Sequence, residues 1–354
     1  MKSRYAIIAI LVCLLAACKK ENPAQSTTDT VSEDYLICSQ DSWVSEQDFP
    51  ASYWNIYFTY NNKVYVPNAN EPDVLDRRLY VYDGSAWEDR GETFPTFVTS
   101  AVIAFFTIGS KGYVITENGG SNSSNWSFYE YNILTNNWTR KADFPGEGEF
   151  GVSAFTVNGK CYVAGGYHQL KYINGAWVPP GYSAETWEYN PATNVWTRRH
   201  NLPLKRAYAK GFSLGNKGYI VNGKYPDDLG YLRGLLEYDP ATDNWTSKSL
   251  MPGEGRTNPA VLVIDGVAYA GGGKDEDDNP KTDFYQYSVL NDSWTRVANI
   301  PLVDYDSGMF TINGKGYVIF KKVSWPYIPS DMVRYNPKYC VNINNAGVPV
   351  NGPL

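Results

Sequence analysis

The chain repeats itself about every fifty residues, and this periodicity limits its possible folds more than any other feature. A short apolar run that contains a Tyr and follows a turn recurs six times, at intervals of 48, 49, 57, 50 and 48 residues. The six landmarks are Tyr65, Tyr113, Tyr162, Tyr219, Tyr269 and Tyr317. Self-similarity at such a period indicates one supersecondary unit per repeat, which buries its apolar faces against its neighbours.

Each repeat contains four short segments with the composition of β-strands. In the unit 204–252 we expect strands at 208–214, 217–222, 234–239 and 244–249, separated by Gly, Asn, Asp and Pro turns. The aromatic content of 15%, with 29 Tyr and 11 Trp, also favours strands, because flat side chains pack well on a pleated surface. Six units of four strands predict an all-β fold, a six-bladed β-propeller.

A second landmark predicts how the ring closes. In four units a Trp follows a Tyr by seven residues, and in each complete unit a Pro follows the Trp by seven or eight. The last copy, at Tyr335, has no such Trp, whereas Trp43 near the N-terminus is followed by Pro50. A last blade without its outer strand would expose an unpaired edge. We therefore expect an N-terminal strand at Trp43 to become the outer strand of that blade.

The repeat resembles the kelch family over roughly residues 42 to 340. The double glycine of that family stands at Gly165-Gly166 and again within Gly271–Gly273, followed by the Tyr, Trp and Pro landmarks. The other four units depart from the double glycine. The resemblance implies a six-bladed kelch-type propeller that binds ligands at one mouth of its central channel.

The N-terminus carries the features of a processing signal. Lys2 and Arg4 precede an apolar run over 6–17, which is too short to span a bilayer comfortably. The run ends at Leu15-Ala-Ala-Cys18, which resembles a bacterial lipobox. We expect a signal peptide at 1–17, acylation of Cys18, a flexible tether at 18–33, the propeller at 34–340 and a tail at 341–354. Because Lys19 is not the Asp that often retains lipoproteins at the inner membrane, we expect anchoring in the outer membrane, facing the periplasm or the cell surface.

Two cysteines flank the expected closure. Cys38 lies five residues before Trp43, and Cys340 lies five residues after Tyr335. In an oxidising compartment this placement predicts a Cys38–Cys340 disulfide. Cys161, inside an apolar strand, is interpreted as a small buried residue.

The expected binding site is a ring of charged and aromatic side chains at the channel mouth. The loops that lead into first strands and those that join second and third strands meet there. The candidate ligand-binding residues are Trp54, Glu147, Glu149, His168, Trp177, Arg206, Lys224, Arg233, Arg256, Asp304, Asp306 and Trp325. Such a set suits a sugar, whose C–H faces lie on aromatic rings and whose hydroxyls bind charged groups. The same polar residues can instead tie neighbouring blades together.

Composition and motifs exclude several functional classes. A net charge of −6 without a basic cluster is not the footprint of a nucleic-acid-binding protein. No P-loop, nucleophile elbow or zinc-ligand spacing is present, so we expect neither metal nor cofactor. The copper radical oxidases among kelch-type propellers use two His ligands, whereas His200 here falls in a predicted outermost strand.

One enzymatic alternative stays open. Six-bladed kelch proteins of the bacterial envelope include the N-acetylneuraminate epimerases, or mutarotases, in which an acid follows an Asn-Gly and an Arg follows a few residues later. Arg233 is similar to that Arg, but Lys224 stands in place of the acid, so Glu147 or Asp306 would have to serve as the catalytic carboxylate. The leading hypothesis is therefore a monomeric, lipid-anchored module that binds a glycan or an envelope protein, with the mutarotase as the alternative.

Overall fold

The structure, a computed structural model, describes residues 35–39, 41–50, 56–67, 78–92, 102–117, 126–147, 150–173, 176–225, 230–301, 307–320, 331–338 and 340–343. The chain divides into two compact units, Ser39–Tyr339 and a smaller unit formed by the two chain ends up to Cys38 and from Cys340. In these described residues all regular structure is β-strand, as the sequence predicted.

Six four-stranded antiparallel sheets form the unit Ser39–Tyr339, counted over its described residues. In chain order, blade 1 contains β3 (Phe58–Tyr60), β4 (Lys63–Pro67), β5 (Arg78–Tyr82) and β6 (Trp87–Glu92); blade 2 contains β7 (Val102–Ile108), β8 (Lys111–Glu117), β9 (Trp126–Asn132) and β10 (Asn137–Arg140); blade 3 contains β11 (Ser153–Val157), β12 (Lys160–Ala164), β17 (Thr186–Asn190) and β18 (Val195–Arg199). Blade 4 contains β19 (Lys210–Leu214), β20 (Lys217–Val221), β21 (Leu235–Asp239) and β22 (Asn244–Lys248); blade 5 contains β23 (Ala260–Ile264), β24 (Val267–Gly271), β25 (Phe284–Ser288) and β26 (Ser293–Val297); blade 6 contains β27 (Gly308–Ile312), β28 (Lys315–Phe320), β29 (Asp331–Asn336) and β2 (Ser42–Ser45).

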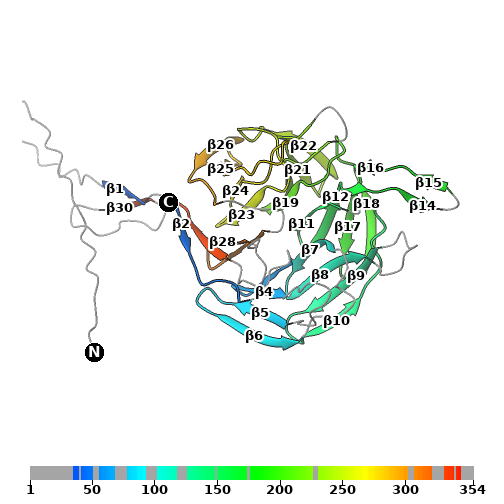
Figure 1. Cartoon of the computed structure of the whole chain (residues 1–354), viewed down its shortest axis with the longest axis horizontal. Helices are drawn as coiled ribbons and strands as arrows, with labels where there is room; N and C mark the ends of the chain where they lie inside the picture. The colour runs from blue at the N-terminus through cyan, green and yellow to red at the C-terminus, as the bar shows by residue number, and fades with distance from the viewer. Residues whose placement is uncertain are drawn as a thin grey trace, which may run out of the picture. The chain divides into compact units, whose positions relative to one another are not determined.

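The blades form a closed ring with their first strands innermost (Figure 1). Each first strand contacts the first strand of the next blade, and β27 of blade 6 returns to β3 of blade 1. The described apolar core consists of six clusters, and each cluster lies between two neighbouring blades. A single blade therefore has no core of its own, which is why the sequence has to repeat.

One aromatic pair recurs in every blade and explains the Tyr and Trp landmarks. The Tyr near the end of the third strand packs on the Trp of the fourth strand, with ring centroids 4.8–5.0 Å apart. The pairs are Tyr82–Trp87, Tyr131–Trp138, Tyr189–Trp196, Tyr238–Trp245, Tyr287–Trp294 and Tyr335–Trp43. In several blades the indole N–H also donates to a backbone carbonyl before the blade, as Trp294 does to Ser249 O at 3.0 Å. The Tyr–Trp pair thus holds each outer strand on its own sheet. Where the indole hydrogen bond forms, it also links the outer strand to the preceding blade.

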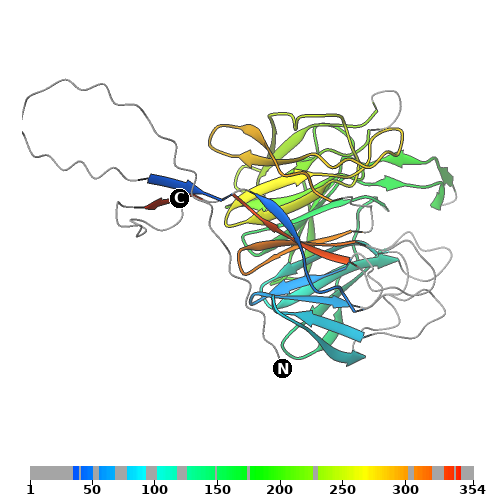
Figure 2. The same ribbon diagram turned by 60° about the vertical axis from the view of Figure 1, so that its left-hand side comes forward.

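The predicted closure of the ring is confirmed. β2 pairs antiparallel with β29, and Trp43 lies directly opposite Tyr335. The pairing continues with a hydrogen bond of 2.9 Å from Glu46 N to Met332 O, and the Glu46 carboxylate forms an ion pair with Arg334. Figure 2 shows β2, in blue, beside β29, in red.

The two chain ends form a small sheet of their own. β1 (Tyr35–Cys38) pairs antiparallel with β30 (Cys340–Ile343), and Cys38 lies opposite Cys340 in the register. Directly opposed residues in antiparallel strands have Cα atoms about 4.5–5.5 Å apart, a separation that a disulfide can span. The Cys38–Cys340 disulfide stays a prediction, and recovery of both cysteine peptides as free thiols from protein produced in an oxidising compartment would contradict it. Cys161 is fully buried, and burial raises the pKa of its thiol well above the usual value.

The 57-residue repeat owes its length to an insertion between the second and third strands of blade 3. This insertion forms two short pairs, β13 (Tyr167–His168) with β16 (Gly181–Tyr182), and β14 (Lys171–Ile173) with β15 (Ala176–Val178). It leaves from the end of the second strand, so it lies on the face of the ring where the first strands begin.

Candidate functional site: the mouth of the central channel

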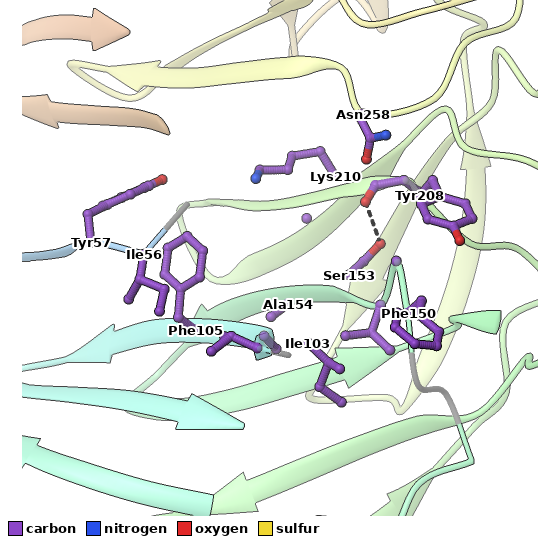
Figure 3. Close-up of a pocket in the computed structure, with 16 residues that line it drawn as sticks. Ile56, Tyr57, Ile103, Phe105, Phe150, Ser153, Ala154, Tyr208, Lys210 and Asn258 are labelled. Atoms are coloured by element: carbon purple, nitrogen blue, oxygen red, sulfur yellow. Dashed lines mark hydrogen bonds between the residues drawn. The ribbon is translucent and has the colours of Figure 1, made fainter. Parts of the chain in front are cut away.

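The segments that lead into the innermost strands enclose a cavity of about 660 Å³. Blade 1 contributes Ile56 and Tyr57, blade 2 the start of β7, blade 3 residues 150–154, blade 4 residues 208–211 and blade 5 Asn258. Figure 3 shows these side chains converging on one space from several strands. A cavity of this size, lined by apolar and polar groups together, is typical of a small-molecule site.

Three equivalent residues with left-handed backbone conformation shape one side of this cavity. Gly151, Tyr208 and Asn258 each lie two residues before a first strand and have φ values of 60°, 58° and 49°. They are linked by hydrogen bonds, from Tyr208 N to Gly151 O at 2.7 Å and from Asn258 N to Tyr208 O at 2.8 Å. A Cβ at position 151 would lie 2.6 Å from Tyr208 N, so this position requires glycine. The three residues form a hydrogen-bonded arc along the cavity wall.

Tyr208 is unusual within this arc because a bulky residue rarely adopts a positive φ. Such a conformation costs on the order of 1–2 kcal/mol and persists only where the surroundings enforce it. Ser153 adds a further restraint by donating from Oγ to Ala209 O at 3.0 Å, the bond drawn in Figure 3. This bond restrains the backbone next to Tyr208, which lines the cavity.

Lys210 places a cation in the cavity. It begins β19 and extends its side chain into the space that Tyr57 reaches from blade 1 (Figure 3). Burial lowers the pKa of the Lys210 ammonium, and no described carboxylate lies within ion-pair distance of it. Burial raises the pKa of the Tyr57 hydroxyl, which therefore stays protonated and able to donate a hydrogen bond. Together they offer hydrogen-bond donors on the cavity wall.

Aromatic rings make up much of that wall. The Tyr57 ring lies at 4.9 Å from Phe105 and 5.8 Å from Phe310, measured between ring centroids, and Phe150 faces the cavity from blade 3. Ring faces bind the C–H surfaces of a sugar, whereas Lys210, Ser153 and Asn258 can serve its hydroxyls. The chemistry expected at the mouth is thus available from these residues.

Most of the residues predicted from the sequence lie outside this cavity. Trp54, Glu149, Asp304, Asp306 and Trp325 lie outside the described residues. Trp177 is 67% exposed on β15, and His168 is 9% exposed on β13. Of the twelve candidates, none that the structure describes lines the cavity.

The remaining candidates belong to the loops around the mouth. The Glu147 side chain is exposed, and its backbone N–H donates to Glu185 Oε2 at 3.0 Å. The ammonium of Lys224 lies over the ring of Tyr231, 5.4 Å from its centroid. Arg233 is exposed and donates to Gly253 O at 3.2 Å. Arg206 and Arg256 are buried, at 4% and 1% exposure, and Arg256 forms an ion pair with Asp283 inside blade 5.

Sequence reasoning missed the residues that line the cavity, although a signal for two of them was present. Lys210 interrupts the apolar pattern at the start of a first strand, and Tyr208 ends a segment that leads into that strand. A charge at a position that must face the channel is such a signal. The sequence gives no such signal for Phe105 and Tyr57, because an aromatic residue in or next to an inner strand is equally consistent with a position in the hydrophobic core.

The described residues contain neither a metal-ligand cluster nor a membrane-spanning helix. They contain no group of three or more His, Cys, Asp or Glu side chains that could hold a metal ion. Over the same residues no helix is long and apolar enough to cross a bilayer.

Fold and site define the class of protein: a six-bladed kelch-type β-propeller with a cavity at its channel mouth. Residues 255–301, which begin at Gly255 before blade 5 and end at the Pro after it, match the protein-family description "Kelch motif". The chain is also similar to the N-acetylneuraminate epimerase of Pasteurella multocida (strain Pm70), with 33% identity over 109 residues. The similar stretch covers 30% of this chain and 27% of that protein. The match therefore spans only about a quarter of the relative's length.

Proposed function

We propose that this protein is a binding module that takes a carbohydrate at the mouth of its central channel. The observation that carries the proposal is the cavity, which four aromatic residues, Tyr57, Phe105, Phe150 and Tyr208, line together with Lys210. Aromatic faces supply contact area for sugar C–H groups, and a cation with hydroxyl and amide groups supplies directional hydrogen bonds. A kelch propeller suits this role because its closed ring holds these groups rigidly.

The channel is tested by substituting two residues that line it. We expect Tyr208→Asn to weaken glycan binding about tenfold, because Asn tolerates the positive φ while the stacking ring is lost. Lys210→Met should weaken binding by a similar factor, because a charge-assisted hydrogen bond is removed. A glycan array followed by calorimetry on residues 34–354 measures both effects.

The control is Leu290→Ala, at a position 92% exposed on the turn between β25 and β26. It should bind as the parent protein does. If no glycan binds more tightly than millimolar, the carbohydrate proposal is wrong and an envelope protein becomes the better candidate for the mouth.

A sialic-acid mutarotase is the second candidate, and the similarity to an N-acetylneuraminate epimerase favours it. Arg233 is exposed and could bind the sugar carboxylate. Against this candidate, Lys224 occupies the place expected for the acid and lies over Tyr231. NMR of freshly dissolved N-acetylneuraminate anomers decides the matter, since an unchanged equilibration rate at micromolar protein removes the enzyme.

We further propose that the module is tethered to the bacterial outer membrane through acylated Cys18. The support is the Leu15-Ala-Ala-Cys18 sequence after a short apolar run, with a polar segment between it and the ring. In cells, Cys18→Ser should abolish incorporation of a clickable fatty acid and move the protein out of the membrane fraction. Retention of the label by that variant would rule out this anchor.

A further inference from the structure

Arg206 and Arg256 occupy the same position in two consecutive blades, four residues before the first strand. The backbone carbonyl of each accepts a hydrogen bond from a glycine of the preceding blade, Gly166 N to Arg206 O at 2.8 Å and Gly223 N to Arg256 O at 2.9 Å. The guanidinium groups also match, because Nη1 donates to Asn222 O in blade 4 and to Gly272 O in blade 5, both at 3.3 Å. The two sites are structural copies.

They differ in one partner. Arg256 forms a bidentate pair with Asp283, at 2.7 and 2.8 Å, and its Nε donates to Glu254 O at 3.2 Å. Gly234 takes the place of Asp283 in blade 4. Its carbonyl accepts from Asn222 N at 2.9 Å, as that of Asp283 accepts from Gly272 N at 3.0 Å. Blade 4 therefore repeats the backbone of blade 5 but has no carboxylate at this position.

Among the described residues, the missing carboxylate leaves the buried Arg206 without a compensating charge. Its side chain belongs to a residue only 4% exposed, and its buried Nε has no hydrogen-bond partner. Among the described residues the guanidinium has one acceptor, Asn222 O, and no ion pair. Burial lowers the pKa of Arg206 to about 10, which reflects the cost of an unpaired buried cation. A buried donor of this kind calls for an explanation.

The space beside Arg206 is open. A Cβ built on Gly234 would meet a single described atom within 4 Å, Nη2 of Arg206 at 3.8 Å. Gly234 itself is partly exposed. In blade 5 the Asp283 carboxylate fills the corresponding space and is 17% exposed. A carboxylate placed there, as that of Asp283 is in blade 5, would therefore meet Nη2 of Arg206.

We propose that Arg206 binds the carboxylate of an acidic sugar, which occupies in blade 4 the position that Asp283 occupies in blade 5. A guanidinium matches a carboxylate through two parallel hydrogen bonds, and Arg256 forms them with Asp283 through Nη1 and Nη2. At Arg206, Nη1 donates to Asn222 O as that of Arg256 does to Gly272 O, and no described residue accepts a hydrogen bond from Nη2. Arg206 lies two residues before Tyr208, on the segment that leads to the channel cavity. The inference rests on the proposed sugar site and names the charged group of its ligand.

The geometry is tested first without any ligand. Gly234→Asp should raise the melting temperature by several degrees, because it supplies the missing partner from within the chain. Gly234 does not have a positive φ, so an Asp is tolerated there. Gly234→Asn is the matched control, since it fills the same space without the charge and should give little or no rise. Equal melting temperatures for the two variants would show that Arg206 does not face this space.

Acetate is the minimal ligand probe. At about ten times its dissociation constant it should raise the melting temperature of the parent protein by about 2–4 °C relative to chloride of equal ionic strength. Gly234→Asp should lose this response, whereas Gly234→Ala, which leaves most of the space open, should keep it. An identical acetate response in the parent and Gly234→Asp proteins overturns the proposal.

Binding experiments with sugars distinguish the role proposed for Arg206 from the proposed carbohydrate-binding function. Calorimetry with N-acetylneuraminate and with its methyl ester should show binding of the acid and at least tenfold weaker binding of the ester. Binding of both with equal affinity, or of neutral glycans alone, would leave the sugar site standing and refute the role of Arg206. An acetate response without binding of any glycan would instead support the carboxylate site and refute the carbohydrate module.

Discussion

Trp43→Ala is expected to destabilise the whole propeller by about 3–5 kcal/mol, the usual cost of removing a large aromatic from a packed site. The Trp43 ring packs on Tyr335 at 4.8 Å and on Phe284 at 5.6 Å, measured between centroids. Its indole N–H also donates to Ala298 O at 3.4 Å. Its strand closes the ring, so loosening it exposes the edge of β29 and weakens the interface of blades 5 and 6. Denaturant unfolding followed by Trp fluorescence and circular dichroism measures the loss.

Two comparisons make this result specific. Trp294→Ala removes the same pair, Tyr287–Trp294 at 4.8 Å, from a blade built from one continuous segment. The two variants should lose similar stability if β2 is a full member of blade 6. Trp177→Ala, at an exposed position, should leave the unfolding midpoint unchanged. A loss below about 1 kcal/mol for Trp43→Ala would mean that the ring does not depend on its N-terminal strand.

Asp283→Ala is expected to have an effect of comparable size, about 3–5 kcal/mol, because it leaves a buried arginine without its partner. Arg256 is 1% exposed and donates two hydrogen bonds to Asp283. The variant would give blade 5 the arrangement already present in blade 4, where Arg206 faces Gly234. Urea unfolding at pH 7 measures the change, and an Arg256→Met/Asp283→Ala double variant should recover part of it.

The same pair predicts an acid dependence of stability. Burial raises the pKa of Asp283, but the hydrogen bonds and the charge of Arg256 lower it by more, so the pKa lies below the usual value of Asp. A carboxyl whose pKa is lower in the folded state stabilises the fold at pH values above the unfolded pKa of about 4. This contribution is lost as the pH falls through the folded pKa. The Asp283→Asn variant should show a shallower loss of stability over that acid range, and identical pH profiles would refute this role.

The fold could be predicted from the sequence to the level of single strands. In the unit 204–252 the predicted strands 217–222 and 244–249 correspond to β20 (Lys217–Val221) and β22 (Asn244–Lys248). The first strand was placed two residues too early, because Tyr208 and Ala209 look like strand residues. The positive φ of Tyr208 instead ends the incoming loop there. Local alternation of side chains predicts strands well, whereas a left-handed residue is set by its neighbours in other blades.

The residues that line the cavity were not among the predicted candidates, and the reason is geometric. The repeat indicates which loops share a mouth, but not how deep each side chain sits. Arg206 and Arg256 were both expected to bind a ligand, yet Arg256 is engaged by Asp283, a residue that lies 27 positions away. Only the matched backbone hydrogen bonds of the two blades show that Gly234 takes the place of Asp283, so that no carboxylate stands there beside Arg206. The cavity residues themselves come from five blades, so no local pattern identifies them as a set.

The spacing of the Tyr, Trp and Pro landmarks by itself determined that this chain forms a ring of six sheets in which Trp43 pairs with Tyr335. The physical reasons are that a blade without its outer strand would leave an unpaired edge, and that each repeat can bury its apolar faces only against its neighbours. What the tertiary structure decided is which polar groups remain available after the blades have packed. That outcome depends on contacts between residues far apart in the chain, where one side chain either neutralises a buried charge or leaves room for a ligand to do so.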